Sequence, residues 1–133
     1  MTAEVQQKWE NKNAYYAQVW AASNVRCLNP SPYAHTALVV AFEHNRPSGM
    51  PLDAAVRTAS WWFIHAADKL WANVKDGVAI QNGGPGERYQ GKSWEGFERE
   101  RWGVWEQGLR DARECIPDHE KWFFTKWPSI GSV

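Results

Sequence analysis

Apolar side chains recur at spacings of three and four along most of the chain, which is the repeat of one face of an α-helix. The pattern predicts long helices over about 3–23, 32–44, 52–75 and 94–115, and a short final helix over 118–126. No segment alternates apolar and polar residues as a half-buried strand does. We therefore predict an all-α fold, a compact bundle of four long helices plus a short C-terminal helix.

Proline, glycine and serine mark the expected helix boundaries. Ser31 stands where an N-cap belongs, and Pro32 suits the first turn of the second helix. The fourth helix is expected to begin at Trp94 or Gly96, with Ser93 as its cap.

The chain has the length of a single domain, which we place over 1–133. A glycine-rich loop is expected over 77–93, and residues 128–133 are expected to fray. The stretch 37–42 is apolar on all sides, which predicts that the second helix is central and covered by its neighbours.

Tryptophan is unusually frequent in this pattern. Indole is the largest apolar side chain, and its one N–H group needs an acceptor when the ring is buried. A chain of this length has little room for so many rings in an ordinary core, so we expect some to line a ligand pocket or an interface. The tryptophans stand at positions 9, 20, 61, 62, 71, 94, 102, 105, 122 and 127.

Charge is balanced, with 15 basic and 15 acidic side chains interspersed along the sequence. Nucleic acids and anionic membranes select proteins with a basic excess or a basic stripe. We therefore expect neither as a partner. A near-zero net charge tolerates self-association, so a homodimer stays an open alternative.

Cys27 and Cys115 have no C-x-x-C spacing, which favours two reduced thiols in a cytoplasmic protein. The N-terminus has no basic and apolar signal sequence, and no apolar run is long enough to span a membrane.

The segment from Gly86 to Ser93 matches the phosphate-binding pattern G-x-x-x-x-G-K-[ST]. That chemistry needs a buried strand before the loop and a helix after it. Only the short apolar run 78–80 precedes the loop, so we interpret the match as a flexible turn and expect no nucleotide cofactor.

Metal and nucleophile chemistry have no support in the spacing of the relevant residues. Only His119 has acidic neighbours, and side chains adjacent on a helix do not converge on one ion. No serine stands in a nucleophile-elbow setting. We expect no metal and no cofactor.

Asn13 lies among the tryptophans of the first helix, where its amide must find hydrogen bonds. We expect it either to tie the helix to a backbone group or an indole N–H, or to hold a ligand carbonyl.

His65 and Asp68 stand three residues apart in the third helix, with Trp61 one turn before the histidine. A carboxylate there would orient the imidazole as a general base. The alternative is an ion pair that faces solvent and contributes little.

Glu43 lies at the end of the apolar second helix. In an apolar slot, a carboxyl group would have a raised pKa and could act as a general acid. More often such a glutamate pairs with an arginine, and Arg101, between Phe97 and Trp105 on the fourth helix, is the expected partner.

Three segments together resemble one known family. They are W-E-N-K-N-A-Y at 9–15, L-D at 52–53 with A-S-W-W-F-I-H-A at 59–66, and G-F-E-R-E-R-W-G-V-W at 96–105. This combination resembles the fungal family of helical proteins described as domain of unknown function three-six-three-two. The resemblance covers about 9–112, and it implies a fungal source and an all-helical domain but no activity.

Two functions remain. The first is a small cofactor-independent cyclase or isomerase of fungal secondary metabolism, acting on an apolar or aromatic metabolite held in a tryptophan-lined pocket. The catalytic candidates are His65, Asp68 and Glu43. The ligand-binding candidates are Asn13, Trp61, Trp62, Arg101, Trp102 and Trp105. The second is a non-catalytic helical ligand-binding or oligomeric scaffold protein, in which the tryptophans anchor an interface.

Overall fold

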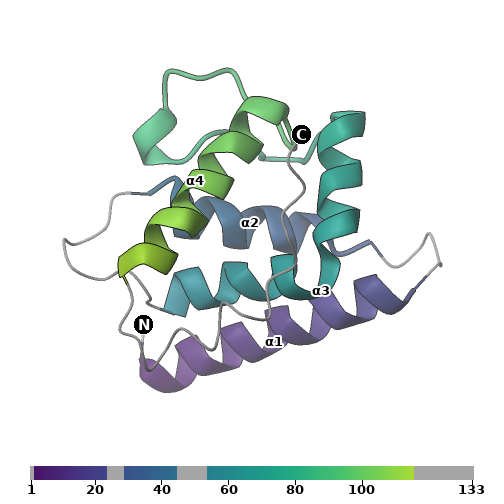
Figure 1. Ribbon diagram of the computed structural model, residues 1–133, viewed down its shortest axis with the longest axis vertical. Coiled ribbons are helices and arrows are strands. Elements are labelled where there is room, and N and C mark those ends of the chain that lie inside the picture. The colour runs from purple at the N-terminus through teal and green to yellow at the C-terminus, as the bar shows by residue number, and fades with distance from the viewer. Residues whose placement is uncertain (1, 24–28, 45–53, 116–133) are drawn as a thin grey trace.

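The computed structural model describes residues 2–23, 29–44 and 54–115, apart from the side chains of Arg113 and Cys115. These ranges contain four α-helices and a short 3-10 helix, so the predicted all-α class is confirmed (Figure 1). The helices are α1 (Ala3–Ala22), α2 (Ser31–Phe42), α3 (Ala54–Asp76), η1 (Glu87–Tyr89) and α4 (Arg99–Cys115). The expected helix at 118–126 and the tail at 128–133 lie outside the described residues.

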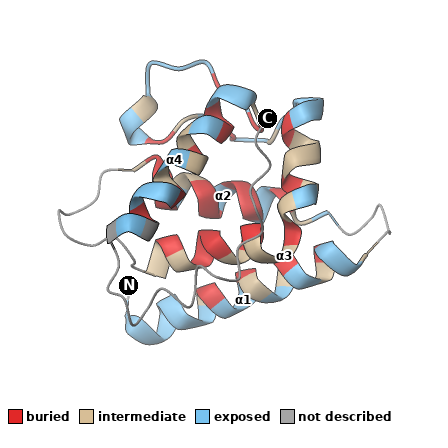
Figure 2. Ribbon diagram, viewed as in Figure 1, coloured by how far each residue is buried: buried red, intermediate tan, exposed pale blue. Residues whose placement is uncertain are grey.

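The start of α1 is fixed by Thr2, whose hydroxyl accepts a hydrogen bond from the Val5 N–H at 3.2 Å. The first two turns of the helix are exposed, and burial begins one turn later (Figure 2). The buried positions follow the helical repeat and form the face that packs on α3; they are Glu10, Asn13, Ala17 and Trp20.

The second helix starts one residue earlier than the sequence predicts. Ser31 is its first residue and not its N-cap; the cap position is Pro30, which has no side chain able to accept a hydrogen bond. The helix ends at Phe42, and it is not covered on all sides, because Tyr33 and Val40 are exposed.

The third helix carries the predicted apolar stripe, but its axis is broken. Ala66 has φ −133° and ψ 29°, outside the helical range, and beyond it the helix turns away from the line of α1 (Figure 1). The stripe stays buried on both sides of the break, at Phe63 and at Leu70. The bend brings the second half of α3 toward the segment that leads into α4.

The segment between α3 and α4 makes a two-stranded contact with itself. The Ile80 N–H donates to the Glu95 oxygen at 3.0 Å, and the Phe97 N–H donates to the Val78 oxygen at 2.9 Å. The prediction that α4 begins at residue 94 or 96 with Ser93 as cap is therefore wrong: this pairing occupies the backbone there, and the helix begins at Arg99.

Two glycines inside α4 predict opposite effects on stability. A Cβ at Gly103 would meet no atom within 4 Å, so Gly103→Ala is expected to stabilise the protein by about 0.5–1 kcal/mol through helix propensity. A Cβ at Gly108 would lie 2.4 Å from Cδ1 of Phe42, so Gly108→Ala is expected to cost about 1–3 kcal/mol. Urea unfolding of the two variants checks this, and equal midpoints would contradict the packing of α4 on α2.

Candidate functional site

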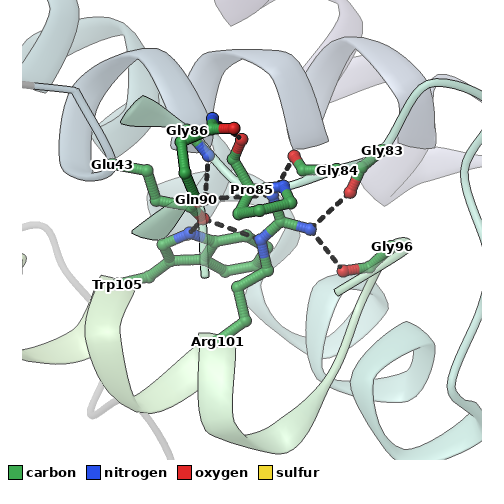
Figure 3. A network of polar contacts seen from close by, with 9 residues as sticks. All are labelled: Glu43, Gly83, Gly84, Pro85, Gly86, Gln90, Gly96, Arg101 and Trp105. Atoms are coloured by element: carbon green, nitrogen blue, oxygen red, sulfur yellow. Dashed lines mark hydrogen bonds and ion pairs between the residues drawn. The ribbon is translucent and has the colours of Figure 1, made fainter. Parts of the chain in front are cut away.

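A buried ion pair joins the end of α2 to the first turn of α4. Glu43 follows α2 directly, Arg101 is the third residue of α4, and both side chains are fully buried. The arginine Nε lies 2.7 Å from Oε2 of Glu43, and Nη2 lies 3.0 Å from Oε1 (Figure 3). The pairing expected from the sequence is confirmed, in the two-point geometry that suits a guanidinium and a carboxylate.

The rest of the Arg101 guanidinium is bound to the loop backbone. Nη1 donates to the oxygens of Gly83 at 2.7 Å and Gly96 at 3.0 Å, and Nη2 donates to the oxygen of Gly84 at 2.7 Å (Figure 3). A guanidinium has five N–H donors, and here all five have acceptors. The Trp94 ring centre lies 5.2 Å from the guanidinium carbon. No donor of Arg101 is left for a ligand.

The Glu43 carboxylate is equally occupied. Besides the two bonds from Arg101, it accepts the Trp105 indole N–H at 2.7 Å and the Gly86 N–H at 2.9 Å. An ionised carboxylate has about four acceptor positions, and all are filled. The Glu43 backbone oxygen also accepts the Arg88 N–H at 2.9 Å. We call Glu43, Arg101, Trp105 and their loop partners the Glu43 cluster; it fastens the 83–96 loop to two helices.

A histidine that sequence reasoning missed lies beside this cluster. His35 is 3% exposed, and its ring packs edge-on against Phe97 and Trp105, with centroids 5.4 and 5.9 Å away. Burial, aided by the Arg101 charge, lowers the pKa of His35 from 6.5 to about 4, and Glu43 and a hydrogen bond to the Gly96 backbone oppose this. Its position in the apolar α2 stripe, three residues before Leu38, was the signal that could have found it.

This histidine predicts a specific pH dependence of stability. Because the folded pKa lies below the unfolded value, the unfolded chain takes up a proton first as the pH falls from about 6.5 toward 4. The free energy of unfolding should then fall by about 2 kcal/mol between about pH 7 and pH 5, and His35→Gln should remove most of that slope. Urea unfolding at a series of pH values measures it. The matched variant His44→Gln, at a half-exposed histidine, should keep the dependence of the unfolding free energy on pH. Loss of this dependence in His44→Gln and not in His35→Gln would contradict its assignment to His35.

The seam between α1 and α3 is held by Asn13. Its Oδ1 accepts the Trp62 indole N–H at 2.9 Å, and its Nδ2 donates to the Trp9 oxygen at 2.9 Å. Trp62 is fully buried, so neither it nor the bound face of Asn13 is open to solvent. This is the indole contact that the sequence offered as one of two roles for Asn13.

A second carboxylate, Glu10, was missed. It is 7% exposed, accepts the Trp61 indole N–H at 2.9 Å through Oε2, and accepts the Arg57 Nε–H at 3.2 Å through Oε1. Glu10 stands three residues before Asn13, on the same face of α1, and this spacing could have revealed it.

The proposed His65 and Asp68 pair straddles the break in α3. The His65 ring is half-buried and lies nearly parallel to the Trp61 ring, at 5.7 Å and 10°. Asp68 is exposed, on the other side of the non-helical residue Ala66.

The predicted site residues therefore occupy separate places. Glu43, Arg101 and Trp105 are in contact; Asn13 bonds Trp62; and His65 stacks on Trp61. Trp102 packs at 5.4 Å from Phe63 and 5.3 Å from Trp71, measured between ring centres. Each of the eight tryptophans in the described ranges is buried or half-buried. Trp122 and Trp127 lie outside those ranges.

One hollow of about 490 Å³ opens beside the Glu43 cluster. Of the tryptophans, Trp94 lines it, and none of the predicted site residues does. The lining residues are Ala79–Gly84 together with Trp94 and Glu95.

The phosphate-loop match has a different structure from the one that pattern requires. An isolated bridge at Ala79 precedes it in place of a strand, and Glu87–Tyr89 form a 3-10 turn. The Gly86 N–H is bound to Glu43, and the Lys92 Nζ lies 2.7 Å from a carboxylate oxygen of Glu100. The groups that would hold a phosphate are thus committed elsewhere.

The described ranges contain no helix long and apolar enough to cross a membrane. Nor do these ranges bring three histidine, cysteine or acidic side chains together around one point as metal ligands.

Comparison with known proteins places the chain in a family. No curated protein and no solved structure matches the chain. One family model, described as "Protein of unknown function (DUF3632)", matches residues 2–109, which is most of the chain and includes the Glu43 cluster and the α1–α3 seam. The chain therefore belongs to this family of unknown function.

Proposed function

We propose that the protein is a non-catalytic helical module that binds a small aromatic ligand. The observation that carries this proposal is the saturation of the Glu43 cluster. General acids and polarising groups must reach the substrate, whereas the Glu43 and Arg101 side chains are fully buried and every donor and acceptor on them is used.

Three of the buried polar residues have the same task, which is to accept a hydrogen bond from an indole. The N–H groups of Trp61, Trp62 and Trp105 donate to Glu10, Asn13 and Glu43, respectively. Since an unpaired buried N–H costs about 1–3 kcal/mol, each of these polar residues is explained by the tryptophan beside it. This supports a rigid scaffold whose interior is not reactive.

Incubation with a set of aromatic metabolites tests the proposal. A binding module should show a saturable change in tryptophan fluorescence, and mass spectrometry should recover each ligand unchanged. Light scattering adds the oligomeric state, since a tight dimer with inert fluorescence would favour the scaffold form of this function. Turnover of any ligand would contradict a non-catalytic role.

A cofactor-independent cyclase or isomerase is the second candidate, and it now depends on His65. That ring is half-buried, is stacked on Trp61 and lies next to the break in α3. Of the predicted catalytic groups, His65 alone is both partly exposed and flanked by an aromatic ring. If turnover is found, His65→Ala should abolish it. The control variant His44→Gln, at a half-exposed histidine, should keep the activity.

A fungal source, a place in secondary metabolism and a cytoplasmic location remain part of the proposal. The neighbouring genes test them most quickly: genes for oxidases, synthases or transferases beside this one would support a metabolite ligand, and their absence from every genome that carries the gene would count against it.

A further inference from the structure

We infer that the hollow between residues 79–84 and 94–95 binds an uncharged aromatic amide. This deepens the proposed function and rests on it, because it names the place and the chemical class of the ligand. The hollow has a volume of about 490 Å³, enough for a small ring compound.

The backbone of the hollow presents a hydrogen-bond donor to a ligand. The Gly83 oxygen accepts from Arg101, and since the Gly83–Gly84 peptide is planar and trans, the Gly84 N–H points away from the arginine. Gly84 is exposed and lines the hollow, and this N–H has no acceptor among the described residues. The charged hydrogen bond on the same peptide polarises the N–H and strengthens it as a donor.

The side chains of the hollow define the charge of the ligand. Gln81 and Asn82, whose primary amides both donate and accept, line the hollow together with Glu95, which carries a carboxylate. Among the described residues that line the hollow there is no lysine or arginine, and the Arg101 beneath it has no free donor. An anionic ligand would meet Glu95 with no cation to offset it, whereas a neutral amide offers a carbonyl to Gly84 and N–H groups to the acceptors.

The apolar side of the hollow favours an aromatic ring on that amide. Ala79, Ile80 and Trp94 form part of the wall, and the Trp94 ring packs against the Tyr89 ring with centroids 5.3 Å apart. Gly83 is packed so closely that a Cβ would lie 2.7 Å from the Ile80 oxygen, so the turn that shapes the hollow has no room for a side chain at this position. Such a preformed site binds a ligand without ordering the loop first.

Benzamide and benzoate are the probes, because they have the same size and differ in charge. In ¹H–¹⁵N NMR titrations, benzamide should shift the Gly84 and Asn82 signals with a Kd of about 1–10 mM, as expected for a fragment of this size, and leave Gly91 unchanged. Benzoate should bind at least about fivefold more weakly than benzamide. In the Glu95→Gln variant, the Kd values of benzoate and benzamide should lie closer together.

Asn82→Gly is the variant of choice, since φ is +60° at this residue and glycine keeps that backbone while losing the amide. It should weaken benzamide binding about fivefold. Unchanged Gly84 and Asn82 signals at about ten times the expected Kd would overturn the inference, as would tighter binding of benzoate. Shifts confined to residues elsewhere would overturn this site but leave the binding function standing. Hydrolysis of benzamide to benzoate in the same tube would instead contradict the non-catalytic function.

Discussion

Replacing Arg101 by methionine is expected to lower the free energy of unfolding by about 3–5 kcal/mol, as removal of one partner of a buried ion pair does. The variant would leave the Glu43 carboxylate fully buried without its counter-charge. It would also strip hydrogen bonds from the oxygens of Gly83, Gly84 and Gly96, which hold the loop in place. Chemical denaturation followed by circular dichroism measures the loss.

The matched control is Arg57→Met at the α1–α3 seam. Arg57 also pairs with a glutamate, at 3.2 Å from Glu10, but its side chain is 37% exposed, so this substitution should cost clearly less than Arg101→Met. Adding Glu43→Leu to Arg101→Met should recover part of the loss, because the uncompensated charge is then gone. Equal costs for the two arginine variants would contradict the structural role of the Glu43 cluster.

Gly96→Ala is expected to cost about 4 kcal/mol, from backbone strain and steric overlap together. Gly96 has φ +156°, which side-chain-bearing residues rarely adopt, and its Cβ would lie 2.4 Å from the Val78 oxygen and 2.8 Å from the Ala79 Cα. The Gly96 oxygen also accepts from Arg101, so a shift of this backbone would reach the Glu43 cluster.

Thermal unfolding of Gly96→Ala beside Gly91→Ala measures this effect. A Cβ at Gly91 would meet no atom within 4 Å, and the position is exposed, so that change should stay within about 0.5 kcal/mol. A Gly96→Ala protein as stable as the Gly91→Ala protein would show that the pairing of 78–80 with 95–97 is wrong.

The local periodicity of apolar residues predicted most of the helices. It failed at positions where contacts between distant segments determine the backbone conformation. The stripes of α1 and α3 predicted their buried faces, but the α3 stripe continues without interruption through Ala66, so nothing in its spacing marks the break. The start of α4 depends on Gly96 pairing with Ala79, a contact that a helical repeat does not encode.

The candidate site shows the same division. The Glu43–Arg101 pair could be predicted because opposite charges stood on two apolar faces and had to meet. Trp62 and Trp105 do not line the hollow, because both are fully buried and their N–H groups bond to Asn13 and Glu43. A high frequency of tryptophan indicates that many large rings must be accommodated. The spacing of these residues does not show whether the indole N–H groups bond to a ligand or to protein side chains.

The exchange rate of the Trp105 indole proton in D₂O tests most directly whether the Glu43 cluster is closed. This proton is bonded to Glu43 in a fully buried setting, so we predict that it exchanges only through near-global unfolding and matches the slowest backbone amides of α4. Exchange within seconds under native conditions would mean that water reaches the carboxylate, and the assignment of this cluster to structure rather than chemistry would be wrong.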